Sequence, residues 1–242
     1  MIEIKNLHKA FGDNKVLQGV NLDIDTGETL VIIGRSGCGK SVLIKHIVGL
    51  LYPDEGFVKV EGQKVDDMSM KELYQLRTKV GFLFQASALF DSMTVEENIF
   101  LPLVESGKRF TQAELNKKVS EKLELVGMAG VQKLKPAELS GGMKKRVGLA
   151  RALITDPDYV FYDEPTTGLD PIMSDSIDDL IKELTDKLNV TSVVVTHDMY
   201  SVKNVANQVA MMHEGKIYFL GTPGELLSST DRIIKEFIQR TA

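Results

Sequence analysis

The segment from Gly34 to Ser41 constrains this chain more than any other part of the sequence, because it reads Gly-Arg-Ser-Gly-Cys-Gly-Lys-Ser. An apolar, β-branched run from Thr29 to Ile33 precedes it, and a helical pattern continues to Leu50. Glycines between a strand and a helix let backbone amides curl around a phosphate, and the helix N-terminus adds partial positive charge. A glycine-rich turn with an exposed lysine would fit the bare spacing, but the flanking strand and helix favour a phosphate-binding loop.

Each position of this loop has an expected part in binding a nucleotide. Lys40 would reach the β- and γ-phosphates, and the Ser41 hydroxyl would bind Mg²⁺. Cys38 is expected to fill a small space in the loop rather than act as a nucleophile, because the sequence places no base beside it. The predicted nucleotide-binding residues here are Gly34, Arg35, Ser36, Gly37, Cys38, Gly39, Lys40, Ser41 and Val42.

A second apolar run, Tyr159 to Tyr162, ends in two adjacent carboxylates, Asp163 and Glu164. Enzymes with a phosphate loop commonly hold Mg²⁺ through an Asp at such a strand end. Asp163 is therefore the candidate metal ligand, and Glu164 is placed to polarise an attacking water. Two solvated acids at the end of a strand would look the same, so this interpretation depends on the phosphate loop upstream.

Short β-branched runs alternate with longer helical patterns along much of the chain. Buried strands, apolar on both faces, are predicted at residues 29–33, 80–84, 158–162 and 191–195. Helices are predicted at residues 40–50, 174–188 and 199–206. The segments 2–24 and 57–61 alternate apolar and polar residues, which is typical of an antiparallel side sheet. These patterns predict an α/β fold of the P-loop NTPase type, with a mainly parallel central sheet covered on both faces.

The chain is expected to form a single domain over residues 1–242. Segments 1–85 and 140–222 would make the core with its antiparallel part, 86–139 a helical subdomain, and 223–242 a C-terminal helix. Three threonines each stand three residues before a glutamate, the pattern of a capping box at a helix start. These are Thr94, Thr111 and Thr222.

Composition excludes several other functions. The chain has 29 Lys and Arg and 34 Asp and Glu residues, which give a net charge of −5. It therefore lacks the domain-wide positive charge that would attract nucleic acid. One cysteine permits no internal disulfide or cysteine-based metal cluster and fits a reducing compartment. The apolar runs are too short to span a bilayer, and the N-terminus lacks a signal peptide's basic and apolar regions. We therefore expect no nucleic-acid partner and no direct membrane span.

A third motif, Leu139-Ser-Gly-Gly-Met143, opens the helical run from Lys144 to Ile154 and makes an anion site there. A helix cap would explain its serine but not both glycines. Together with the other two motifs it resembles the ATP-binding subunits of ABC transporters, over nearly the whole chain. The resemblance implies an ABC ATPase cassette with a RecA-like core, ATP and Mg²⁺ as cofactors, and a head-to-tail homodimer. In that dimer, the γ-phosphate held by the second copy would be contacted by Ser140, Gly141 and Gly142.

The resemblance also implies roles for individual residues outside these three motifs. Phe11 stands where an aromatic ring stacks on adenine, and Gln85 resembles the glutamine that contacts Mg²⁺ and relays nucleotide state to the membrane subunit. Asp170, in Gly-Leu-Asp, resembles the loop that contacts the partner subunit, and His197 resembles the switch histidine that holds the γ-phosphate. The resemblance thus implies catalytic roles for Glu164, His197, Lys40 and Gln85, and metal contacts for Ser41, Gln85 and Asp163.

Within the family, the segments Lys40 to Leu50, Gly81 to Val95 and Leu226 to Ile238 are similar to Mla/MCE-type ATPases. This implies phospholipid transport between bacterial inner and outer membranes. It also implies a cytoplasmic protein, peripheral on the cytoplasmic face of the inner membrane. The implied partners are a polytopic permease, a periplasmic MCE lipid-binding subunit and, in some systems, a small STAS-type protein.

Several alternatives stay open. The apolar residues after Gln85, up to Phe90, either dock a helix from a membrane partner or are buried in the helical insertion. The chain would equally suit an ABC ATPase that powers another import or export cargo. A non-transport ABC protein acting on ribosomes or DNA is disfavoured by the single cassette and the acidic charge. A GTPase or small-molecule kinase is disfavoured because no guanine-reading Asn-Lys-x-Asp occurs.

Overall fold

The computed structural model describes residues 1–241, and its central sheet has the strand order β10–β9–β3–β8–β7–β6. The strands are β3 (Thr29–Gly34), β6 (Val80–Leu83), β7 (Tyr159–Asp163), β8 (Thr191–Val195), β9 (Gln208–His213) and β10 (Lys216–Gly221). All neighbours pair in parallel except β10, which pairs antiparallel with β9. The predicted α/β fold with a mainly parallel sheet is confirmed.

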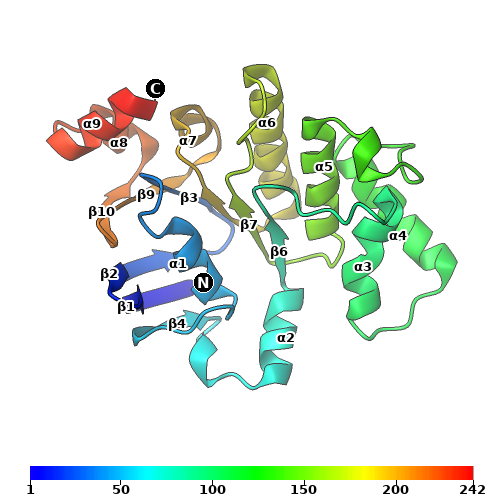
Figure 1. The fold of residues 1–242 in the computed structure, drawn as a ribbon, viewed down its shortest axis with the longest axis horizontal. Helices are drawn as coiled ribbons and strands as arrows, with labels where there is room; N and C mark the ends of the chain where they lie inside the picture. The colour runs from blue at the N-terminus through cyan, green and yellow to red at the C-terminus, as the bar shows by residue number, and fades with distance from the viewer. Residues whose placement is uncertain (242) are drawn as a thin grey trace.

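A second, antiparallel sheet has the order β2–β1–β4–β5. Its strands are β1 (Ile2–Phe11), β2 (Asn14–Ile24), β4 (Glu55–Val60) and β5 (Gln63–Lys64). One apolar core joins this sheet, helix α1 (Lys40–Ile47) and one face of the central sheet, and it includes Ile4, Leu43 and Ile32. Figure 1 shows β1, β2 and β4 on one side of α1. The antiparallel sheet therefore supports the helix that begins at the phosphate loop.

The other face of the central sheet is covered by a second core, in which Val31 and Ile33 of β3 meet residues of the following helices. The alternation of β3 side chains between the two cores explains its uninterrupted apolar sequence. The remaining helices are α2 (Met70–Thr78), α3 (Val95–Glu105), α4 (Gln112–Leu125), α5 (Gly141–Ala152), α6 (Pro171–Leu188), α7 (Met199–Val205), α8 (Pro223–Ser228) and α9 (Arg232–Thr241). Short 3₁₀ turns occupy Val65–Asp67 and Pro136–Glu138.

Helices α3 and α4 occupy much of the segment 86–139 and lie with α5 at the far end of the molecule from β1 and β2 (Figure 1). The predicted capping boxes are present: Thr94, Thr111 and Thr222 begin α3, α4 and α8. In each, the threonine oxygen accepts from the glutamate amide, and the glutamate carboxylate accepts from the threonine amide. Within residues 1–241, no helix is both long and apolar enough to cross a membrane.

Several boundaries differ from the sequence prediction, among them the start of α6 at Pro171 instead of residue 174. The strand predicted at 80–84 was expected to be buried on both faces, but β6 is an edge strand that ends at Leu83, and Phe84 is 41% exposed. The helix predicted over 40–50 ends at Ile47, because Gly49 adopts a left-handed φ of 64° that breaks it.

The range 223–242, predicted as one C-terminal helix, holds the two helices α8 and α9; Ala242 lies outside the described residues. Asp231 explains the break, since its Oδ1 accepts hydrogen bonds from the amides of Ile233 and Ile234 and so begins a new helix.

One buried acid joins two helices that flank the central sheet. Asp178 of α6 is fully buried, and its Oδ2 accepts a hydrogen bond of 2.7 Å from Ser201 of α7. Its Oδ1 has no partner among the described residues. Burial raises the pKa of Asp178 to about 7, opposed by the Ser201 bond and aided by nearby acids.

We expect Asp178 to make folding stability depend on pH. Its pKa is higher in the folded than in the unfolded chain, so the folded state binds more protons and stability falls as pH rises from about 4 to about 7, by at most about 1.4 kcal/mol per pH unit. Asp178→Asn removes this slope. Urea unfolding at pH 5 and pH 8 should therefore show that the free energy of unfolding of the variant, relative to that of the wild type, is higher at pH 8 than at pH 5. Asp186→Asn, an exposed acid on the same helix, should not; equal gains in the two variants would contradict the assignment.

Candidate active site

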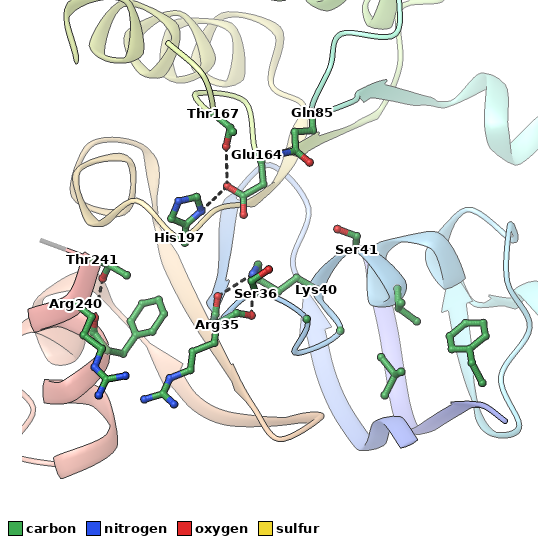
Figure 2. A pocket seen from close by; sticks show the side chains of 17 residues that line it. Arg35, Ser36, Lys40, Ser41, Gln85, Glu164, Thr167, His197, Arg240 and Thr241 are labelled. Atoms are coloured by element: carbon green, nitrogen blue, oxygen red, sulfur yellow. Dashed lines mark hydrogen bonds and ion pairs between the residues drawn. The ribbon is translucent and has the colours of Figure 1, made fainter. Parts of the chain in front are cut away.

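The loop between β3 and α1 lines a pocket of about 630 Å³ (Figure 2). Gly34 and Gly39 have φ of 153° and 103°, a region that side chains rarely adopt. A Cβ at Gly34 would lie 2.5 Å from the carbonyl oxygen of Met212, and one at Gly39 would lie 2.8 Å from Leu17 Cδ2. Because β9 and β2 press this closely on the loop, only glycine fits at both positions.

The cation and the hydroxyl predicted to meet phosphate and metal stand at the start of α1. Lys40 is 8% exposed, and its ammonium group donates to the carbonyls of Gly34 at 2.8 Å and Arg35 at 3.3 Å. Ser41 Oγ donates to Asp163 Oδ1 at 3.0 Å. The first turn of α1 is therefore in contact with the end of β7.

These oxygen groups are chemically suited to Mg²⁺, which prefers hard oxygen ligands. A hydroxyl and a carboxylate already lie in contact, and Gln85 lines the same pocket. Across residues 1–241, no three or more His, Cys, Asp or Glu side chains are grouped to hold a metal on their own. Mg²⁺ usually takes one or two protein ligands and completes its shell with water and phosphate, so this donor set fits it.

Glu164 and His197 form a pair on the opposite side of the pocket from Ser41 (Figure 2). His197 Nδ1 lies 2.8 Å from Glu164 Oε2, which also accepts from Thr167 Oγ1 at 3.3 Å. The Glu164 side chain is 14% exposed, whereas that of His197 is 58% exposed. The carboxylate is thus fixed from two sides, and the imidazole remains open to a ligand.

Of the other residues predicted to bind the nucleotide, most line the pocket but Cys38 does not. Phe11, at the end of β1, lines the pocket with an exposed ring, and Arg35, Ser36, Gly37 and Val42 line it too. Cys38 is not part of the lining; its sulfur packs toward Gly34. Burial raises the pKa of the Cys38 thiol despite the nearby Lys40, which agrees with its expected role as filler.

Ser140, Gly141, Gly142 and Asp170 lie outside this pocket. Ser140 is exposed and caps α5 by accepting from the amide of Met143, while Asp170 caps α6 by accepting from the amide of Met173 at 3.0 Å. Ser140, Gly141 and Asp170 are exposed and can meet a second molecule rather than the pocket of their own chain, whereas the predicted contact residue Gly142 is buried against Met173 of α6.

One wall of the pocket was not predicted from the sequence. Phe237, Arg240 and Thr241 of α9 line it, and Glu236 lies 3.9 Å from Arg35 of the phosphate loop. The apolar face of α9 was predicted, but only the tertiary fold brings the helix beside a loop about two hundred residues earlier in the chain. Thr167, the second partner of Glu164, was missed in the same way.

Comparison with known proteins agrees with this geometry. Residues 17–167 match the family model described as ABC transporter. The chain belongs to the ABC transporter family. Its structure superimposes with a TM-score of 0.84 on the ATP-binding cassette MJ0796, solved as a dimer in a post-hydrolysis state bound to ADP and Pi. That match has 33% identity and covers 92% of this chain and 99% of the other.

Curated relatives of this ABC ATPase carry different transport names. The probable ribonucleotide transport ATP-binding protein mkl of Mycobacterium leprae is 40% identical over 98% of the chain, which spans about two thirds (68%) of that relative. The intermembrane phospholipid transport system ATP-binding protein MlaF of Haemophilus influenzae is 39% identical, covering 99% of the chain and 90% of the relative. The methionine import ATP-binding protein MetN of Clostridium tetani is 40% identical, and the match covers 99% of this chain and 75% of that relative.

The ABC ATPase should lose ATP affinity when Lys40 is replaced by alanine. The ammonium group would otherwise make charge-assisted bonds to phosphate, so we expect a loss of about tenfold to a hundredfold. Calorimetric titration with ATP checks this. Lys45→Ala, an exposed lysine on the same helix, serves as the matched control and should bind normally. Unchanged binding by the Lys40 variant would overturn the role of the loop.

Proposed function

We propose that this chain binds and hydrolyses ATP with Mg²⁺ to power phospholipid transport between the inner and outer membranes of a bacterium. One observation carries the catalytic part of the proposal. The ends of β3, β6, β7 and β8 bring together the groups that phosphoryl transfer to water requires. Lys40, Ser41, Gln85, Glu164 and His197 line one pocket, and Asp163, which is not part of its lining, accepts a hydrogen bond from Ser41.

Each group has a defined task in this proposal. Phe11 stacks on adenine, and the loop amides with Lys40 hold the β- and γ-phosphates. Ser41, Asp163 and Gln85 hold Mg²⁺, which when bound neutralises charge on the phosphate oxygens. Glu164 accepts a proton from the attacking water, and its bonds to His197 and Thr167 keep it aimed at that water.

The proposed active unit is a head-to-tail homodimer with two ATP molecules at its interface. The separation of Ser140 and Gly141 from the pocket of their own chain supports this, because the exposed N-terminus of α5 then serves a second copy. No acidic residue occupies the first turn of α5 to repel a phosphate. The dimeric state of the related MJ0796 cassette is a further support.

A groove lined in part by sequence neighbours of Gln85 supports docking of a membrane permease. It has a volume of about 560 Å³ and is lined by aromatic side chains, among them Tyr74, Phe84 and Phe90, which are 44%, 41% and 51% exposed. Of the apolar residues after Gln85, Ala86, Ala88 and Phe90 are exposed rather than buried in the insertion. We propose that a cytoplasmic helix of a polytopic permease occupies this groove and places the ATPase on the cytoplasmic face of the inner membrane.

The cargo rests on similarity to MlaF, whose name assigns it to intermembrane phospholipid transport and which the chain matches over 90% of its length. By the same similarity we propose a periplasmic MCE lipid-binding subunit and a small STAS-type protein as further partners. Similar identity to MetN makes an importer of an amino acid the second candidate. Identification of the co-purifying subunits separates the two.

Glu164→Gln should keep ATP binding but lose hydrolysis, because the amide cannot accept the proton of water. We expect the rate to fall by about a hundredfold or more. With no hydrolysis to reopen it, the variant should elute as a dimer in ATP during gel filtration. Glu121→Gln, a surface acid 57% exposed, is the control and should hydrolyse normally. Normal turnover in the Glu164 variant would remove this residue as the base.

Affinity purification from native membranes in mild detergent tests the partners and cargo. Mass spectrometry of the wild type should find a permease, an MCE subunit and enriched phospholipid. Phe90→Asp places a charge in the groove and should release the permease. Leu220→Asp, at an exposed residue of β10 that does not line the groove, should retain it. A permease with a different substrate-binding protein would overturn the phospholipid cargo, and retention by the Phe90 variant would overturn the groove.

A further inference from the structure

A lysine buried beneath the pocket connects two of its loops. Lys145 of α5 is 5% exposed, and its ammonium group donates to the backbone carbonyl of Gln85 and, at 3.2 Å, to that of Glu164. Burial lowers the pKa of Lys145, while the carboxylates of Glu164 and Asp163 oppose that effect. A buried ammonium group is tolerated only where such partners surround it, so this position is built for a cation.

A second cation on the same helix holds the next turn of the same loop. The guanidinium group of Arg151 donates to the carbonyls of Ser87 and Ala88, both at 2.7 Å. Two residues of one helix therefore bind three carbonyls in the segment from Gln85 to Ala88.

The backbone held by these cations is strained. Glu164, Ser87 and Ala88 have φ of 50°, 59° and 47°, the left-handed region that residues with a side chain rarely adopt. Such conformations persist only where the surroundings hold them, and they gather at functional sites. Here the carbonyls of all three strained residues accept hydrogen bonds from Lys145 or Arg151.

We propose that Lys145 and Arg151 form a cationic clamp that positions Gln85 and Glu164 for hydrolysis and ties both to helix α5. The clamp rests on the proposed roles of these two residues. Neither cation lines the pocket, so both are positioning residues. Since α5 begins at the exposed Ser140 cap, a shift of this helix against a second subunit moves the Gln85 loop and the Glu164 backbone together.

The test compares Lys145→Met, Lys145→Arg and the surface control Lys117→Met, whose lysine is 80% exposed, in the full-length chain. We expect Lys145→Met to bind ATP within about twofold of the wild type yet to lose about tenfold or more in kcat, because the phosphate loop is intact while the carboxylate is misplaced. Lys145→Arg should restore most of kcat. Backbone amides of residues 85–90 and 164–167 should exchange hydrogen faster in the methionine variant but not in the control.

Arg151→Lys keeps the charge at a partly exposed position but loses the two-pronged guanidinium contact, so it tests the clamp even if Lys145→Met does not fold. It should lose about threefold to tenfold in kcat with ATP affinity retained. Wild-type kcat in the folded variants, or parallel losses of kcat and ATP affinity, would overturn the clamp. Glu164→Gln in the same assay separates the two proposals. If this variant hydrolyses ATP normally, the proposed catalytic base is wrong. If it is inactive while the clamp variants are fully active, the clamp alone is overturned.

Discussion

The parallel pairing of β6, β7, β8 and β3 is the constraint on which the site depends. Parallel neighbours end at the same edge of a sheet, so the loops that follow them emerge side by side. Gln85 follows β6, Asp163 ends β7, His197 follows β8, and Lys40 follows β3. Residues far apart in the sequence are thereby brought to contacts of 2.8 and 3.0 Å without any local signal that links them.

Rigid packing beneath this edge allows the loops to hold unfavourable conformations. The turn after β7 is fixed from three directions, since the Glu164 amide donates to the carbonyl of Val195, its carbonyl accepts from Lys145, and its carboxylate meets His197. A left-handed glutamate costs about 1 kcal/mol or more, which these contacts offset. In this conformation the Glu164 side chain lines the pocket.

The parts of the fold that were predicted correctly are those with strong local patterns. The run Thr191–Val195 is buried on both faces and agrees with β8 to the residue, and the three threonine caps were found from spacing alone. The strand predicted at 80–84 is present as β6, but its full burial was wrong, because an apolar run does not reveal that the strand lies at the edge of the sheet. The β9–β10 hairpin was missed, although Glu214 and Gly215, both with positive φ, form the two-residue turn typical of such a connection.

The residues of the candidate site also fall into those predicted from local sequence and those placed only by the tertiary fold. The phosphate loop and the two carboxylates at the end of β7 follow from sequence, since each is a contiguous motif with a physical rationale. The positions of Phe237 and Arg240 depend on where α9 packs, and the clamp depends on the distance between two motifs that are read separately. Local sequence can identify which groups are present, but the contact between them is a property of the sheet and its helices.

In the proposed dimer, the placement of Ser140 would leave each chain with only half of the catalytic unit. The α5 N-terminus is exposed and lies outside the pocket that holds Lys40, so its amides cannot serve the phosphates of the same chain. In a dimer with two-fold symmetry, the α5 N-terminus of each copy would face the pocket of the other copy, so that both pockets would be closed. In that arrangement α5 has one end at the phosphate of the second copy and its buried cations at the glutamate and glutamine of its own pocket. A single rigid helix would therefore connect the two ATP molecules of the dimer.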